Sequence, residues 1–159
     1  MSFNEICNNI TNSYKYQSLK NDYHHGLNRY IHIMHVARGT YIISKIFGLD
    51  YISATRGALL HDYFNEGEYL DIVGLDKPRI HPFLALNNSL KEHDLNIIER
   101  NIIISHMYPI GLIRPLFFES WIVTCIDKIV ATYEYINYKF KDKLVLEFIF
   151  ILNILSLKL

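Results

Sequence analysis

The chain has 159 residues, half of which are apolar, and it carries no net charge at neutral pH. This length fits a single domain with a sizeable buried core, and the absence of a basic surplus argues against broad electrostatic binding to nucleic acid. Two cysteines are too few for a disulfide framework, and the polar residues 1–16 do not resemble a secretory signal peptide, so we expect a cytoplasmic protein.

Apolar residues recur at helical spacing, whereas strand-like alternation and hairpin turn signals are weak. Gly48 is placed to cap a helix, Pro82 is suited to a first helical position, and Pro109 should stop another helix. The pattern predicts an all-α fold, a compact bundle of about six to seven helices that forms one domain over residues 1–159. In chain order, the expected helices cover about residues 4–18, 28–47, 53–62, 82–92, 94–106, 118–138 and 144–159.

The last of these segments, residues 144–159, is strongly apolar. It is shorter than the roughly 18–20 residues that a membrane span requires, and Glu147, Asn153 and Lys158 interrupt it. We interpret it as a helix that closes the core or forms an interface in a homo-oligomer, with no membrane partner. A membrane anchor is the alternative interpretation.

Four of the expected helices turn a histidine or an aspartate toward an apolar face. These residues are His32, the adjacent pair His61 and Asp62, His106 and Asp127. Burying the two carboxylates costs several kcal/mol unless a positive charge is near. Few lysines or arginines face inward, so imidazoles and carboxylates without a thiolate predict a site for a divalent transition metal.

A single histidine on an apolar face is usually an ordinary core residue, and each position taken alone has this simpler explanation. We apply it to His24, His25, His35 and His93, although His35 lies one turn from His32 and could support it. The full set of inward-facing residues is harder to explain by chance.

Three sequence strings resemble the HD-domain superfamily of metal-dependent phosphohydrolases, an all-α family. They are Tyr30–Ala37, Ala58–Asp62 and Cys125–Lys128, and the similar region covers about residues 28–134. The resemblance implies that His32, His61, Asp62 and Asp127 are metal ligands. Members with two-metal centres carry two further histidines, for which His81 and His106 are the candidates here, while His93 competes with His81.

The resemblance further implies a cofactor of one or two divalent transition metal ions, drawn from Fe, Mn, Co, Ni or Zn. Asp62 would bridge the ions and take part in catalysis, in which a metal-activated water hydrolyses a phosphate ester of a nucleotide or a related small molecule. Lys128 is a candidate catalytic and substrate-binding residue, and Arg29 and Arg79 are candidates for binding the phosphate. For these three residues, a solvated surface charge is the alternative.

Two other functions remain open at this stage. HD-type sites with six such ligands also occur in di-iron oxygenases, which an iron content and an oxygen requirement would identify. The other is a non-catalytic module. It is either a ligand-sensing or scaffold protein with a vestigial site, which the complete ligand set argues against, or a helical packing module, which predicts no bound metal after purification without chelator.

Overall fold

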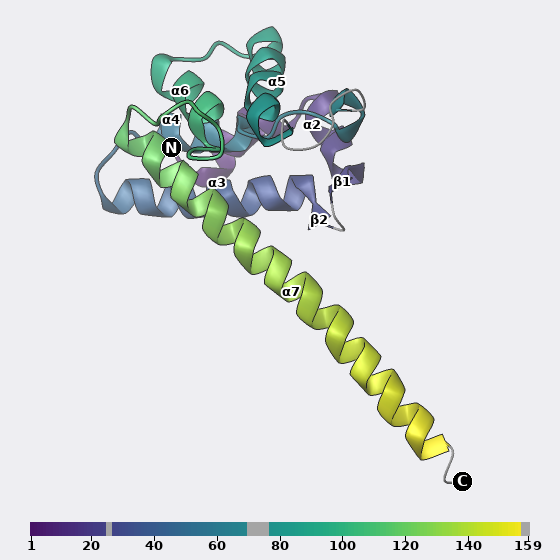
Figure 1. Ribbon diagram of the computed structural model, residues 1–159. Helices are drawn as coiled ribbons and strands as arrows, with labels where there is room; N and C mark the ends of the chain where they lie inside the picture. Colours follow the sequence, from purple (N-terminus) through teal and green to yellow (C-terminus); the bar gives the residue numbers. More distant parts are fainter. Residues whose placement is uncertain (25–26, 70–76, 157–159) are drawn as a thin grey trace.

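The computed structural model describes residues 1–24, 27–69 and 77–156, including all of their side chains except those of 23–24, 27, 69 and 141–156. This part of the chain is all-α, with seven α-helices, two 3-10 helices and one antiparallel pair of two-residue strands (Figure 1). The elements are α1 (Phe3–Thr11), α2 (Tyr14–Ser18), η1 (Leu19–Asn21), β1 (Tyr23–His24), β2 (Leu27–Asn28), α3 (Arg29–Ile46), α4 (Tyr51–Leu60), η2 (Glu66–Tyr69), α5 (Lys77–Glu92), α6 (Ile97–Ser105) and α7 (Phe118–Ser156).

Local side-chain chemistry explains where the central helices begin and end. Asn28, Asp50 and Asn96 precede α3, α4 and α6, and each accepts a hydrogen bond from a backbone N–H in the first turn of its helix. Gly48 follows α3 with a φ of 66°, a left-handed conformation that favours glycine, so the predicted cap is confirmed.

The helix boundaries differ from the sequence-based expectation at the first expected helix and at α5. The expected first helix is split, because the Ser13 side chain accepts a hydrogen bond from the Tyr16 N–H and starts α2. The expected start at Pro82 is wrong, since α5 begins at Lys77 and Pro82 lies inside it. Pro78 occupies the first turn instead, where its missing N–H would have had no partner within the helix.

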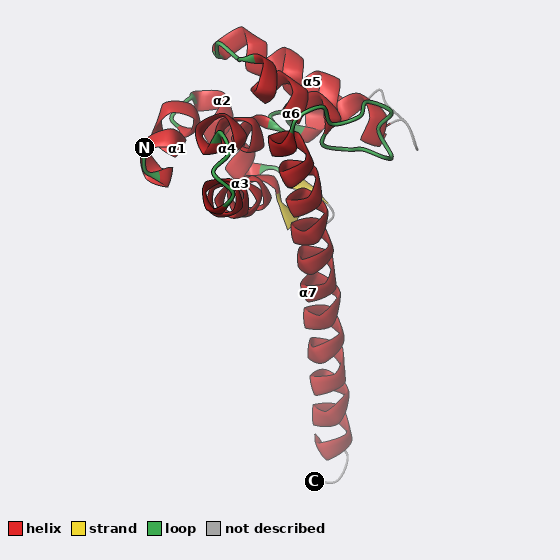
Figure 2. Cartoon of the chain, turned by 90° about the vertical axis from the view of Figure 1, so that its left-hand side faces the viewer, coloured by secondary structure: helices red, strands yellow, loops and turns green. Residues whose placement is uncertain are grey.

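The largest difference is at α7. Two helices were expected at 118–138 and 144–159, but residues 118–156 form one continuous helix, which no glycine or proline interrupts. Its C-terminal part extends away from the other helices, so the expected separate closing helix is not observed (Figures 1 and 2). The side chains of 144–159 lie outside the described residues. Within the described chain, no helix has both the length and the apolarity needed to cross a membrane.

Helix α4 lies at the centre of the bundle and packs against α1, α3, α5, α6 and α7. Helices α4 and α6 approach closely where the Ile102 side chain lies against the backbone of Gly57. The apolar core spreads from this contact to α1, α3, α5 and α7, and its fully buried members include Ile6, Ile10, Ile33, Val36, Leu59, Leu60, Ile102, Ile103 and Val123. His61 and His106 come directly after α4 and α6, so the packing of these two helices also determines where the two imidazoles meet.

Candidate metal centre

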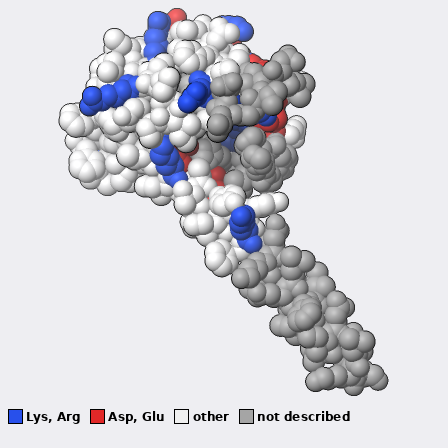
Figure 3. All heavy atoms as spheres, in the orientation of Figure 1, with Lys and Arg blue, Asp and Glu red and all other residues white. Residues whose placement is uncertain are grey.

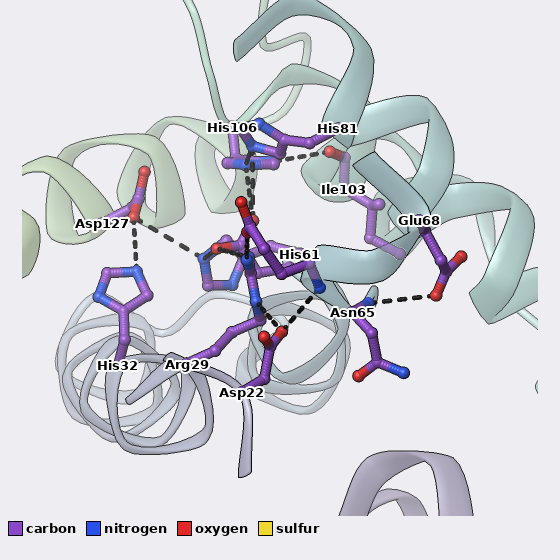
Figure 4. Close-up of polar contacts among 12 residues, drawn as sticks. Asp22, Arg29, His32, His61, Asn65, Glu68, His81, Ile103, His106 and Asp127 are labelled. Carbon is purple, nitrogen blue, oxygen red and sulfur yellow. Dashed lines mark hydrogen bonds and ion pairs between the residues drawn. The ribbon is translucent and has the colours of Figure 1, made fainter. Parts of the chain in front are cut away.

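All six residues proposed as metal ligands converge on one space between the helices. Five of them, His32, His61, His81, His106 and Asp127, are labelled in Figure 4. The ligands come from elements far apart in the chain: His32 from the first turn of α3, His61 and Asp62 from the end of α4, His81 from α5, His106 from the end of α6 and Asp127 from α7. Their burial is high, with exposed fractions of 0% for His61 and 1% for His106. A bundle interior thus contains four imidazoles and two carboxylates.

One half of the cluster surrounds Asp127. Its Oδ1 lies 3.1 Å from Nε2 of His32 and 3.7 Å from Nε2 of His61. The potential ligand atoms of these three residues all lie within 4.8 Å of one another, a spacing that one metal ion can span.

The other half surrounds Asp62. Its Oδ1 lies 3.4 Å from Nε2 of His81 and 3.5 Å from Nε2 of His106, while its Oδ2 lies 3.9 Å from Nε2 of His61. The Nε2 atoms of His81 and His106 are 2.7 Å apart. A second group with metal-ligand spacing consists of His61, Asp62 and His106. Asp62 therefore presents its two oxygens to different imidazoles.

Backbone carbonyls determine the tautomers of two of these histidines. Nδ1 of His61 donates to the carbonyl of Ala58 at 2.7 Å, and Nδ1 of His106 donates to the carbonyl of Ile103 at 2.7 Å. A carbonyl can only accept, so the proton of each neutral ring is on Nδ1 and a lone pair is on Nε2. Both lone pairs point toward the carboxylates, which is the orientation that a metal-binding imidazole adopts.

Two buried atoms of the cluster lack a hydrogen bond among the described residues: Nε2 of His61 and Oδ1 of Asp62. Nε2 of His106 carries no proton in the neutral ring and accepts a hydrogen bond from Nε2 of His81 at 2.7 Å, so the donors within the cluster leave these two atoms without a partner. Leaving such atoms buried and unpaired costs about 1–3 kcal/mol each, and more for a charged group. A cation between them would remove this cost, so the donor set fits a metal ion.

The protonation states agree with this arrangement. Burial lowers the pKa of His61 and lowers that of His81 to about 3, which leaves both rings neutral. Burial opposes charge on Asp62 as well, but its pKa lies well below the usual range; with the neighbouring imidazoles neutral, the guanidinium of Arg29 is the positive charge that stabilises the carboxylate. Burial also opposes charge on His32, yet its hydrogen bonds to Asp127 and Glu134 raise its pKa to about 10. Metal binding at His32 must therefore displace a proton.

Glu134 is a functional residue that the sequence analysis missed. Its Oε2 accepts a hydrogen bond from Nδ1 of His32 at 2.8 Å, and its Oε1 accepts one from Nδ1 of His35 at 2.8 Å. Carboxylates that hold the second nitrogen of a metal-binding histidine fix its orientation and raise its basicity. The sequence does contain one indication of this role: Glu134 follows Asp127 by two helical turns and so lies on the same face of α7.

Replacing Glu134 by glutamine should weaken metal binding by about 10–100-fold, because the amide holds His32 less firmly and without charge. Titration of the apo protein with Mn²⁺ or Zn²⁺, followed by calorimetry, measures this change. His35→Gln is the matched control: His35 is exposed and reaches the site only through Glu134, so its loss should change the affinity less than about threefold. Equal effects of the two substitutions would contradict the role of Glu134.

The three candidate phosphate-binding cations have different environments. Arg29 is buried, and its guanidinium lies 2.9 Å from Asp22, 3.5 Å from Asp62 and 3.1 Å from Glu66, so it orients ligand Asp62. Arg79 is exposed on α5 and is not among the described residues that line the cavity. Lys128 does line it, and its Nζ donates to the carbonyls of His106 and Thr124. Burial lowers the pKa of Lys128.

His93 lies outside the cluster. His93, the competitor of His81, lies beside the Tyr63 ring and contacts none of the six residues, and burial lowers its pKa. The structure thus places His81, and not His93, in the cluster. The side chains of His24 and His25 lie outside the described residues.

A cavity of about 360 Å³ opens onto the cluster. His32, Asp62, His81, His106 and Asp127 line its inner part together with Arg29, Lys128 and Glu134. On the face of the molecule seen in Figure 3, lysines and arginines are scattered among uncharged residues and form no continuous basic patch. Comparison with protein-family models, with curated proteins and with solved structures finds no match to this chain.

Proposed function

We propose that the chain is a metal-dependent phosphohydrolase whose cluster binds one or two divalent transition metal ions. The observation that carries this proposal is a pair of buried ligand atoms, Nε2 of His61 and Oδ1 of Asp62, that have no hydrogen-bond partner among the described residues. The six ligands and their order along the chain also agree with the resemblance to the HD-domain superfamily.

The donor atoms suit the ions expected from the sequence. Imidazole nitrogens and carboxylate oxygens without thiolate favour Fe, Mn, Co, Ni or Zn over softer ions. His32, His61 and Asp127 would hold one ion, and Asp62, His81 and His106 would hold a second. The carboxylate of Asp62 has one oxygen near His81 and His106 and the other near His61, which suits a ligand shared between two ions.

When bound, divalent ions supply water of lowered pKa and neutralise charge on phosphoryl oxygens, which is the chemistry that hydrolysis of a phosphate ester requires. The residues of the chain prepare the site for it. Hydrogen bonds to Ala58 and Ile103 hold the rings of His61 and His106 in one tautomer, and Arg29 fixes Asp62. Lys128, with two of its three protons donated to carbonyls, has one left for a phosphate oxygen.

Metal binding should raise the melting temperature of the purified protein by about 5–11 °C. A free metal concentration a hundredfold above Kd stabilises the folded state by about 2.7 kcal/mol, and in a chain of this size each kcal/mol corresponds to about 2–4 °C. Differential scanning fluorimetry of chelator-treated protein with Mn²⁺, Co²⁺ or Zn²⁺ measures the shift. Ca²⁺ at equal ionic strength is the control, since it prefers sites built from oxygen alone.

The activity is tested with the metal-loaded protein by measuring phosphate release from phosphomonoesters and nucleotides, in air and without oxygen. Release that does not depend on oxygen supports the proposal. Metal binding without phosphate release, accompanied by oxygen consumption, would replace it with an oxygenase. A protein that binds none of these metals would exclude both activities.

A further inference from the structure

The walls of the cavity change in character from the inside to the mouth. The buried ligand cluster forms the inner wall. Met107 and Ile110, which follow His106 in the chain, and Ala131, which follows Asp127, line another part of the cavity. Ile110 is 53% exposed and Ala131 is also exposed, so these two residues lie at the opening. A molecule bound in the cavity therefore meets ligand atoms at one end, and aliphatic carbon together with the exposed Thr132 at the other.

Most other polar groups that line the cavity already have partners. The amide of Asn28 donates to the carbonyl of Lys20 and accepts from the N–H of Ile31. The guanidinium of Arg29 is shared among three carboxylates. Within the described lining, Lys128 is thus the one cationic side chain without a carboxylate partner. The cavity offers a single lysine to an anion beyond the metal ligands.

This distribution of charge limits the number of phosphate groups. Two divalent ions facing the two carboxylates of Asp62 and Asp127 leave a charge of about +2, which one phosphomonoester dianion neutralises. Beyond Lys128, the described lining offers no cation that is free to neutralise a further phosphate. The charge balance therefore favours one phosphate group over a chain of several.

The shape and composition of the cavity limit the alcohol part of the ester. The volume of about 360 Å³ is at the small end of the roughly 300–1,000 Å³ found for small-molecule sites. The described lining contains no phenylalanine, tyrosine or tryptophan on which a nucleobase would stack. Short aliphatic chains complement the surface formed by Met107, Ile110 and Ala131.

On the basis of the phosphohydrolase function proposed above, we propose that the substrate class is the phosphomonoester of a small aliphatic alcohol. The phosphoryl group reaches the ligand cluster and Lys128, and the carbon chain contacts Met107, Ile110 and Ala131. In the reaction, the oxygen of water bonds to phosphorus, the ester P–O bond breaks, and the alcohol leaves with a proton, which gives inorganic phosphate.

Three substrates at matched concentration test this inference with the metal-loaded full chain: butyl phosphate, adenosine 5′-monophosphate and a bis-adenosyl tetraphosphate. We expect kcat/KM for butyl phosphate to exceed both others by at least about tenfold, a difference that a few apolar contacts can produce. If a nucleotide is hydrolysed equally well or better, this inference is wrong while the phosphohydrolase function stands. If no phosphate is released from any ester, the proposed function itself is wrong.

A substitution at the mouth tests the aliphatic wall directly. Ile110→Ser should raise KM for butyl phosphate by about tenfold with kcat little changed, and should alter KM for methyl phosphate less than about twofold, since only the longer chain reaches the mouth. Leu112→Ser is the matched control, because Leu112 is 80% exposed in the same loop and does not line the cavity. Equal effects on both esters, or no effect on either, would overturn the assignment of Ile110.

Discussion

Replacing Asp62 by asparagine is expected to abolish metal binding and phosphate release while the helical bundle stays folded. The substitution keeps the shape of the side chain but removes its charge and one of the two oxygens that lie near His61, His81 and His106. The loss of metal affinity should exceed the roughly 10–100-fold that follows removal of an outer hydrogen-bond partner. Elemental analysis and phosphate release measure the two effects.

The fold should survive because Arg29 retains two of its three carboxylate partners, Asp22 and Glu66. Circular dichroism of the metal-free proteins checks this. The control is Asp94→Asn, an exposed aspartate between α5 and α6 whose side chain makes no contact with the site. An Asp62→Asn protein that keeps its metal content and its turnover would disprove the proposed centre.

Replacing Gly57 by alanine should destabilise the protein by about 2 kcal/mol and lower the melting temperature by about 4–8 °C. A Cβ at this position would lie 2.7 Å from Cδ1 and 2.9 Å from both Cβ and Cγ2 of Ile102. Because Cβ of Ile102 is held by the backbone, the two helices have to separate. The gain of roughly 1 kcal/mol in helix propensity offsets only part of this cost.

The same substitution should impair the metal centre, since His61 and His106 each lie one turn beyond Gly57 and Ile102. Thermal unfolding and metal titration of the variant measure the two consequences. In the double variant with Ile102→Ala, which removes two of the three clashing atoms, the cost of Gly57→Ala should fall by about 1 kcal/mol. Gly67→Ala serves as control because nothing lies within 4 Å of its added methyl group. A neutral Gly57→Ala would show that α4 and α6 can separate without cost.

Helical periodicity was sufficient to predict the all-α fold and the inward direction of His32, His61, Asp62, His106 and Asp127. Burial has a regular period along a helix, so each residue could be assigned to a face before any contact was known. Boundaries were harder to predict, because Ser13 starts a new helix through one side-chain hydrogen bond, and α7 continues where a break was expected.

The partners of the ligands could not be predicted in the same way. Arg29 looked like a free phosphate-binding residue because its three carboxylate partners lie 7 to 37 positions away in the chain. Glu134 was overlooked because its bond to His32 spans 102 positions. Such contacts depend on how helices that are distant in the chain pack together. The local residue pattern of a single sequence does not contain this information.

The distance along the chain between the ligands also has a kinetic consequence. His32 and Asp127 are 95 residues apart, and each half of the cluster requires α4 to be in place between them. The complete ligand set therefore exists only after the most distant helices have packed, late in folding. A metal ion bound there stabilises the native state but not the folding transition state. Metal binding should therefore mainly slow unfolding and leave the folding rate almost unchanged.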